Sequence, residues 1–357
     1  MIEHWLTCAG GAAVAFAAAY ICVPLAKALA FRVGAIDQPD ARKVHSRPMP
    51  RLGGAAIVAA FTLAVLLLVD LRPPYTGVLL GGLLVFAVGA LDDVLGLSPR
   101  VKLAGQLAAA AAAVAGGVNV SFISNPFDGI FYLGKLGVPL TVLWLVGITN
   151  AVNLIDGLDG LAAGVSGIAA LTMGIIALDQ GQAAVACLAF ILAGAVAGFL
   201  PFNFHPARIF MGDAGALFLG FTLACLAVVG LAKSAALISL FIPIVILGIP
   251  VMDTLCAIVR RVNKKAPIFR PDRDHLHHRL LALGYSHRGS VLVIYGVSVF
   301  FGAVAIVLTR VSSPQATLIL SLLLLLIVLG AGRVGMVNPR PGAARALSGR
   351  GGGPLRT

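Results

Sequence analysis

Polar side chains with catalytic potential gather in the stretch NAVNLIDGLDGLAAG, residues 150–164, which apolar residues flank on both sides. On a continuous helix, Asn153, Asp156 and Asp159 lie on one face, because they are three residues apart. A carboxylate close to hydrocarbon costs roughly 2.5–3.5 kcal/mol on insertion scales, so such a residue usually marks a functional site. A turn in which one aspartate caps the next helix explains one acid, but not both acids and the asparagine.

Two further acidic clusters lie at the ends of apolar segments. Asp92 and Asp93 are adjacent at the end of one segment and need a cation, a proton or hydrogen bonds to offset their repulsion. Asp213, in the sequence GDAG, stands where another apolar segment begins. It either caps that helix or brings a carboxylate for a divalent metal to a helix N-terminus, which attracts phosphate.

The largest polar segment, residues 260–290, carries eight Lys and Arg residues and four histidines. His275, His277 and His278 are close together, but no Cys or Glu accompanies them. On a helix His277 points away from the other two, which disfavours a zinc site. Histidine and arginine side chains that donate hydrogen bonds to phosphate fit better. Acids, amides, histidines and arginines together are typical of a divalent metal and a phosphate substrate at a membrane surface.

Membrane-spanning helices must position these clusters, because 59% of the 357 residues are hydrophobic, 11% are charged and the mean hydropathy is +1.00. The apolar runs are long and unbroken, which excludes an outer-membrane barrel. We therefore expect an all-α, polytopic integral membrane protein with about eleven transmembrane helices. The expected spans lie near residues 5–29, 53–70, 76–91, 101–118, 132–150, 161–178, 182–201, 214–232, 235–257, 290–309 and 314–331.

The basic residues predict the orientation of the chain. With the N-terminus outside, all of the 26 Lys and Arg residues face the cytoplasm except Arg72, Lys135, Lys233 and Arg310. The positive-inside rule therefore predicts an N-out, C-in topology, and it accounts for the net charge of +12 without nucleic acid. All the polar clusters then lie at the cytoplasmic face. Residues 1–331 form the expected membrane-embedded domain, and the Gly/Pro/Arg-rich residues 332–357 form a cytoplasmic, disordered tail.

Four motifs in this order resemble those of the polyprenyl-phosphate N-acetylhexosamine-1-phosphate transferases of glycosyltransferase family 4. They are LDDVLGLSPRVKLAGQ, NAVNLIDGLDGLAAG, FNFHPARIFMGDAGALFLG and DRDHLHHRL, and the resemblance extends over roughly residues 5–331. It is greatest to the branch that transfers GlcNAc-1-phosphate from UDP-GlcNAc to undecaprenyl or decaprenyl phosphate and releases UMP. That reaction is the first membrane step of cell-envelope polysaccharide synthesis, as in lipopolysaccharide or teichoic acid synthesis.

The phospho-MurNAc-pentapeptide transferases of peptidoglycan synthesis are the alternative within the family. That branch has three consecutive histidines followed by a hydrophobic residue and an acid, whereas HLHHRL here breaks the run and places Arg279 after it. A transporter is a further alternative. It requires charges at mid-depth in the membrane or paired broken helices, whereas the acids here cluster at span ends.

The resemblance implies a role for each matched residue. The residues implied in catalysis are Asp92, Asp93, Asp156 and His278. The residues implied in substrate binding are Lys102, Asn153, Asp159, Asn203, Phe210, His275, His277 and Arg279. Asp213 and Asp156 match the residues that hold Mg²⁺, for which Mn²⁺ is the alternative cofactor. Within the substrate site, Asp159, Asn203 and Phe210 correspond to the uridine end.

The resemblance also implies a location and partners. We expect a multi-pass protein of the bacterial inner (cytoplasmic) membrane whose partners are UDP-GlcNAc, a polyprenyl phosphate lipid and the bilayer itself. Nucleic acid is not an expected partner. The sequence leaves the oligomeric state open, with a homodimer as one option, and it leaves open the exact donor sugar and the length of the lipid.

Overall fold

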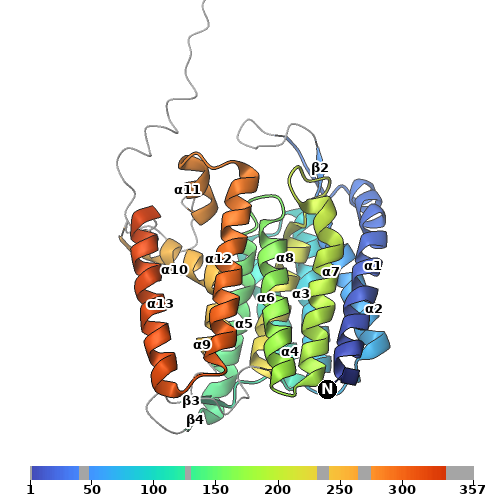
Figure 1. The fold of residues 1–357 in the computed structure, drawn as a ribbon. Coiled ribbons are helices and arrows are strands. Elements are labelled where there is room, and N and C mark those ends of the chain that lie inside the picture. The colour runs from blue at the N-terminus through green and yellow to red at the C-terminus, as the bar shows by residue number, and fades with distance from the viewer. Residues whose placement is uncertain (1, 40–47, 125–129, 231–240, 264–274, 335–357) are drawn as a thin grey trace, which may run out of the picture.

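The computed structural model describes residues 2–39, 48–124, 130–230, 241–263 and 275–334, which form a bundle of helices with two small hairpins (Figure 1). The start of the ninth expected span and most of the expected tail lie outside the described residues. The last described helix continues to Val334, three residues beyond the expected boundary of the membrane domain.

Ten of the eleven expected spans each correspond to one helix, which confirms the all-α, polytopic class. Eight of the described helices are long and apolar enough to cross a membrane by length and composition. Two others, over the second and fourth expected spans, are shorter, with 15 and 17 residues. The ten helices are α1 (Ile2–Val33), α2 (Gly54–Leu68), α3 (Tyr75–Leu95), α4 (Pro99–Ala115), α5 (Gly137–Leu154), α6 (Leu161–Asp179), α7 (Ala183–Asn203), α8 (Gly212–Val229), α12 (His287–Leu308) and α13 (Ser313–Val334).

The ninth expected span, 235–257, is not one helix over its described part. It consists of α9 (Phe241–Ile246) and α10 (Gly248–Asn263), which Leu247 separates. Pro250 has no N–H to donate to the carbonyl of Ile246, so the helical ladder is interrupted here. In Figure 1, α9 runs along the bundle and α10 crosses it at an angle.

Short elements cover the two ends of the bundle. At the upper end of Figure 1, β1 (Ile36–Asp37) pairs antiparallel with β2 (Met49–Pro50), and α11 (Leu276–Ala282) precedes α12. At the lower end, β3 (Phe122–Ser124) pairs antiparallel with β4 (Ile130–Tyr132), followed by the 3-10 turn η1 (Gly134–Leu136). The chain alternates direction, so the C-terminal ends of α3 and α5 and the N-terminal ends of α4, α6 and α8 all lie at the upper end.

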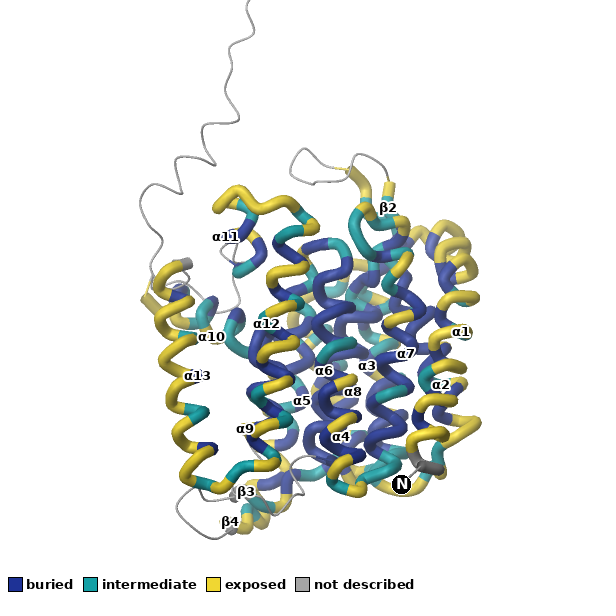
Figure 2. Tube along the Cα trace, in the orientation of Figure 1, coloured by how far each residue is buried: buried dark blue, intermediate teal, exposed yellow. Residues whose placement is uncertain are grey.

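Helix α8 is the centre of the bundle, and Figure 2 shows it surrounded by other buried segments. Glycines let two neighbours approach its first turn. A Cβ on Gly89 of α3 would lie 2.6 Å from the Cα of Ala214, and a Cβ on Gly54 of α2 would lie 2.2 Å from the backbone nitrogen of Gly215. Small residues at such contacts allow close packing of membrane helices. This packing brings the acidic end of α3 against the start of α8.

Candidate active site

Lys102 of α4 binds polar side chains from three other helices. Its Nζ atom is 3.0 Å from Oδ2 of Asp92 on α3, contacts Oδ2 of Asp213 on α8, and is 3.4 Å from Oδ1 of Asn153 on α5. Asn153 in turn donates from Nδ2 to Oδ1 of Asp213 at 2.8 Å. The structure thus brings together four residues from three separate sequence motifs. All four side chains lie near the upper end of the bundle and are largely shielded from solvent.

The two adjacent aspartates at the end of α3 have different partners. Asp92 faces Lys102 and also accepts a hydrogen bond from the Leu97 N–H at 2.7 Å. The side chain of Asp93 is completely buried. Its two oxygens accept hydrogen bonds from the N–H groups of Asp213 and Ala214, at 3.0 and 2.9 Å. Asp93 therefore caps the N-terminus of α8 from a neighbouring helix.

The possibility that Asp213 is itself the cap of α8 is wrong. Met211 occupies the N-cap position and makes no side-chain capping bond, and Asp213 lies in the first turn. Its carboxylate is therefore available to Lys102, Asn153 and the adjoining pocket. Arg51, after β2, adds a cation 3.6 Å from the Asp93 carboxylate. Arg51 is not among the site residues expected from the sequence.

The stretch that contains Asp156 and Asp159 is a turn and not a helix face. Helix α5 ends at Leu154 and α6 begins at Leu161, with Gly160 as its N-cap at a φ of 79°. The expected stacking of both acids on one helix face is wrong, and so is the alternative in which Asp159 caps α6. Gly160 suits this position because it adopts a left-handed backbone without strain. The turn sends the two carboxylates toward different partners.

Asp156 lines a pocket of about 390 Å³. The pocket is also lined by Arg51, Asp159, Asn203, Phe210 and Asp213. Burial, together with the negative charges of Asp213 and Asp93, raises the pKa of Asp156 to about 7, because each disfavours the ionised form. The described part of the site thus holds more carboxylates than nearby cations.

This donor set fits the metal that the resemblance implies. Asp213 and Asp156 line the same pocket, and carboxylate oxygens are among the ligands that Mg²⁺ and Mn²⁺ prefer. A divalent cation between them would offset the repulsion that raises the pKa of Asp156.

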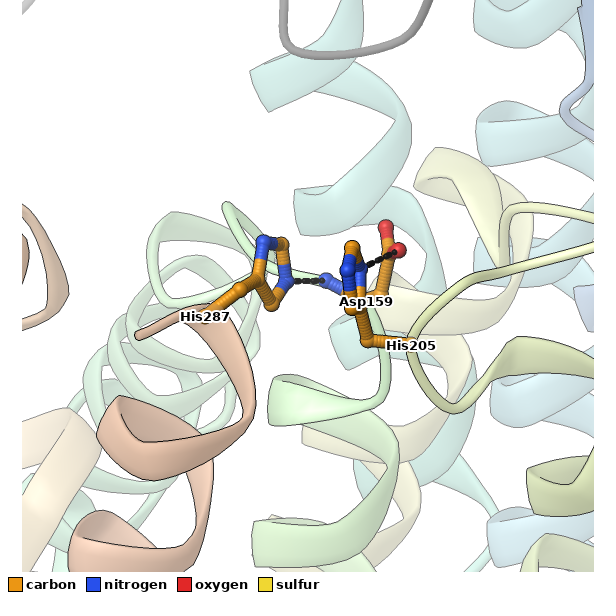
Figure 3. A group of neighbouring side chains, drawn as sticks. All are labelled: Asp159, His205 and His287. Atoms are coloured by element: carbon orange, nitrogen blue, oxygen red, sulfur yellow. Dashed lines mark hydrogen bonds and ion pairs between the residues drawn. The ribbon is translucent and has the colours of Figure 1, made fainter. Parts of the chain in front are cut away.

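Asp159 is held by two histidines (Figure 3). Its Oδ2 atom accepts hydrogen bonds from Nδ1 of His205, at 2.7 Å, and from the Ala207 N–H, at 3.1 Å. Its backbone N–H donates to Nε2 of His287 at 3.0 Å, and the two imidazole rings stack with centroids 4.1 Å apart. Ligand atoms of Asp159, His205 and His287 lie within 4.8 Å of one another, as in a metal site. However, a neutral imidazole has one acceptor nitrogen, and that of His287 is already used, so a metal would have to break this bond.

His205 and His287 are not among the site residues expected from the sequence. The signal for His205 was its place inside the motif FNFHPARIFMGD, two residues after Asn203. No local signal identified His287, which begins α12 and reaches the turn only through the tertiary fold.

Asn203, expected near the uracil, lines the pocket but is also bound to the backbone at both ends of its amide. Oδ1 accepts a hydrogen bond from the Gly160 N–H at 3.1 Å, and Nδ2 donates to the carbonyl of Ile209 at 3.0 Å. Tyr295 of α12 donates to the carbonyl of Gly160 at 2.5 Å. The two bonds of Asn203 hold the turn before α6 against the loop that carries Phe210, which also lines the pocket, and the Tyr295 bond joins the same turn to α12.

The expectation that His277 points away from the other two histidines is wrong. The rings of His275 and His277 are nearly parallel with centroids 5.9 Å apart, and the ring of His278 lies 4.2 Å from that of His277. The reason is that His275 has an extended backbone before α11 begins, so the three residues do not follow one helix. Arg279, in the same helix, is buried.

His277 packs on the turn that carries Asp156. A Cβ on Gly157 would lie 2.4 Å from Nε2 of His277, so only glycine leaves room for this ring. Burial, followed by the neighbouring His278, lowers the pKa of His277 to about 3, and the imidazole is neutral at physiological pH. Nε2 is buried without a hydrogen-bond partner among the described residues. A buried nitrogen of this kind indicates a ligand position beside the Asp156 turn.

An apolar groove of about 440 Å³ lies beside the polar cluster and was not expected from the sequence. It is lined by residues of α5, α8, α9 and α10, among them Leu143, Trp144, Gly147 and Leu255. On α5 the groove extends to Ala151, two residues before Asn153. A groove with this lining suits a hydrocarbon chain.

Comparisons with known proteins agree with the motifs. The sequence pattern of the family described as glycosyl transferase family 4 matches residues 75–231 of this chain. The chain is 45% identical over 324 residues, 90% of each chain, to a protein of Bacillus subtilis named probable undecaprenyl-phosphate N-acetylglucosaminyl 1-phosphate transferase. It is 37% identical to the decaprenyl-phosphate N-acetylglucosaminephosphotransferase of Mycobacterium tuberculosis, over 77% of this chain and 76% of the relative. It is 30% identical, over 75% of each chain, to the undecaprenyl-phosphate alpha-N-acetylglucosaminyl 1-phosphate transferase of Escherichia coli K12.

Proposed function

The chain belongs to glycosyl transferase family 4, and on that premise we propose that it transfers GlcNAc-1-phosphate from UDP-GlcNAc to undecaprenyl or decaprenyl phosphate. UMP is the second product. The observation that carries this proposal is the binding of Lys102 to Asp92, Asp213 and Asn153, at the meeting point of a polar pocket and an apolar groove. Such a site can receive a charged nucleotide sugar from one side and a lipid phosphate from the other.

The nucleotide sugar occupies the polar pocket in this proposal. Asp159, Asn203 and Phe210 line one part of it and form the uridine end, while Asp156 and Asp213 line the part nearest Lys102. Asp213 and Asp156 would hold Mg²⁺, which when bound neutralises charge on the pyrophosphate and so reduces its repulsion of an anionic acceptor. Residues 275–279, here called the histidine segment, cover the sugar or pyrophosphate with His278 and Arg279.

The lipid occupies the apolar groove with its phosphate toward Asn153 and Lys102. A phosphate monoester has a second pKa near 6, so at neutral pH it needs little deprotonation before it attacks. We therefore favour direct attack. A lipid phosphate oxygen forms a bond to the phosphorus attached to the sugar, and the bond from that phosphorus to the oxygen of UMP breaks. Lys102 stabilises the charge on the transferring phosphate, and Asp92 orients Lys102.

The setting follows from the same premise. The chain spans a membrane several times, and the relatives are bacterial proteins. We propose the cytoplasmic membrane of a bacterium, with the polar end of the bundle toward the cytoplasm, where UDP-sugars are made. The reaction would be the first membrane step in the synthesis of a cell-envelope polysaccharide.

One assay tests this function against its closest alternative. Detergent-purified protein is given Mg²⁺ and polyprenyl phosphate with either UDP-GlcNAc or UDP-MurNAc-pentapeptide, and released UMP is measured. We expect UMP from UDP-GlcNAc only, and none when the lipid is omitted. UMP from the pentapeptide donor alone would assign the chain to the other branch, and no UMP from either would contradict the proposal. A phosphorylated protein trapped without lipid would contradict direct attack.

A further inference from the structure

Asp253 is a buried carboxylate on α10 for which neither the sequence motifs nor the proposed reaction provides a role. Asp253 is 1% exposed, and both oxygens of its carboxylate make hydrogen bonds. Oδ2 is 2.7 Å from Nδ1 of His275, and Oδ1 accepts the Leu276 N–H at 2.9 Å. A buried carboxylate in a membrane protein is costly and usually has a function. Here both of its bonds go to the beginning of the histidine segment.

The first bond fixes which nitrogen of His275 carries a proton. A carboxylate only accepts hydrogen bonds, so Nδ1 of His275 must donate to it. Nε2 is then the ring nitrogen that remains for a substrate, whatever the charge of the ring. Carboxylates orient the histidine ligands of metal sites in the same manner, and their loss typically reduces affinity or activity 10–100-fold.

The second bond fixes where α11 begins. This helix has seven residues and is too short to be stable alone, and His275 at its N-cap makes no side-chain capping bond. The Leu276 N–H is one of the first amides of the helix, which have no partner inside the helix. Asp253 satisfies this amide from a different element. The register of α11 determines where His277 lies, and His277 packs against Gly157 beside Asp156.

We propose that Asp253 is a positioning residue for the transfer reaction, which rests on the proposed function. It holds His275 with the proton on Nδ1, and it anchors α11 so that the histidine segment lies on the Asp156 turn. Asp253 acts through His275 and the start of α11 and does not itself touch the substrate.

The decisive variant is Asp253→Asn, which preserves size. The asparagine oxygen can still accept the Leu276 N–H, but its NH₂ group donates, so the bond to Nδ1 of His275 is either lost or kept only with the proton moved to Nε2. We expect kcat for UMP release to fall about 10–100-fold, with a much smaller change in KM for UDP-GlcNAc. The matched control is Asp179→Asn, which removes an exposed carboxylate paired with Arg310 at the other end of the bundle and should leave kcat unchanged.

A double-mutant cycle separates positioning from a general loss of structure. If Asp253 acts through His275, Asp253→Asn should cost little in a His275→Ala background, and the losses should be clearly non-multiplicative. Losses that multiply, or a wild-type kcat in Asp253→Asn, would overturn the proposal.

A measurement that does not depend on enzyme activity tests the role of Asp253 separately from the proposed function. Imidazole ¹⁵N shifts of the wild-type protein, assigned to His275 by their absence in His275→Gln, should show a protonated Nδ1. An unprotonated Nδ1 would overturn the proposal even if the protein is an active transferase. A protonated Nδ1 in a wild-type protein that releases no UMP would contradict only the proposed function.

Discussion

The backbone N–H of Asp213 donates to the buried carboxylate of Asp93 at 3.0 Å, although the two residues lie on different helices. Asp93 thereby holds the first turn of α8 in place, while Asp213 directs its own side chain to Lys102. Asp92, the neighbour of Asp93, binds the same lysine. Of these two adjacent aspartates, Asp93 therefore has a structural role at α8, and Asp92 belongs to the proposed active site.

This difference predicts that substitution of Asp93 lowers thermal stability, whereas substitution of Asp92 lowers activity. Asp93→Ala removes both capping bonds of α8, and loss of a helix cap costs about 0.5–2 kcal/mol. We expect a lower midpoint of thermal unfolding in detergent. Asp92→Asn should leave the midpoint near that of the wild type and reduce UMP release, because the acid that binds Lys102 is lost. Equal thermal midpoints for Asp93→Ala and Asp92→Asn would refute the capping role.

Asp213→Asn tests the proposed metal site. The amide retains the size of the side chain but loses the charge that binds both Lys102 and a divalent cation. We expect UMP release to fall about 100-fold, the upper end of the range for residues that support metal ligands, and the Mg²⁺ concentration for half-maximal rate to rise. Asp70→Asn is the matched control. Asp70 is an exposed aspartate just after the C-terminal end of α2, away from the site, so this variant should behave as the wild type. Full activity of folded Asp213→Asn protein would rule out the metal assignment.

The raised pKa of Asp156 predicts how Mg²⁺ binding depends on pH. With a pKa of about 7 in the metal-free protein, Mg²⁺ competes with a proton for this carboxylate below pH 7. We expect the Mg²⁺ concentration for half-maximal UMP release to fall up to about tenfold per pH unit as pH rises toward 7, then to level off. In Asp156→Asn this dependence should be absent. A half-saturating Mg²⁺ concentration that is the same at pH 6 and pH 8 in the wild type would contradict the assignment.

The same shift predicts the stability of the metal-free protein. The folded pKa of Asp156 lies above the reference value of 3.8, so between these values the folded state binds more protons than the unfolded state. This residue's contribution to the free energy of unfolding therefore decreases as pH rises from about 4 to about 7 and is constant above that. Thermal unfolding with EDTA in the wild type and in Asp156→Asn should differ in this pH range. Parallel pH profiles would show that Asp156 is not protonated in the folded protein.

The contact between Gly157 and His277 predicts a large effect from a single methyl group. Gly157 does not have a left-handed φ, so Gly157→Ala changes only the space available to the imidazole. We expect kcat/KM to fall by up to about 100-fold, because the ring must move beside the Asp156 turn. In a His277→Ala background the added methyl should cost little. Gly296→Ala is the control, since a Cβ there meets nothing within 4 Å.

The apolar groove predicts a separate effect on the lipid substrate. Gly147 of α5 lines the groove, and a Cβ there meets no other atom within 4 Å, so Gly147→Leu extends into open space. We expect KM for polyprenyl phosphate to rise about tenfold, which corresponds to the loss of a few apolar contacts, with KM for UDP-GlcNAc unchanged. Gly296→Leu, on α12 and outside the groove, should change neither KM. An equal rise in both KM values would contradict the assignment of the groove to the lipid.

Local pattern sufficed for the helices and for much of the site. Apolar runs of about 20 residues can be stable in a membrane only as helices, so ten of the spans were predicted close to their observed bounds. Asp92, Asn153 and Asp213 were identified before the fold was known, because charged and amide groups at the ends of such runs are costly and hence informative, whereas Lys102 was implied only by the resemblance to the family. The break between α9 and α10 was missed, since Pro250 interrupts a run that remains apolar on both sides.

The sequence by itself determined the class of protein, the helices and the family, because apolar length and ordered motifs are local properties of the chain. Only the tertiary structure decided what each polar residue touches. It separated Asp92 from Asp93, gave Asp156 and Asp159 different partners, and added Asp253, His205 and His287. The physical reason is that a hydrogen bond joins atoms within about 3 Å, and the packing of distant helices, not spacing along the chain, brings such atoms together.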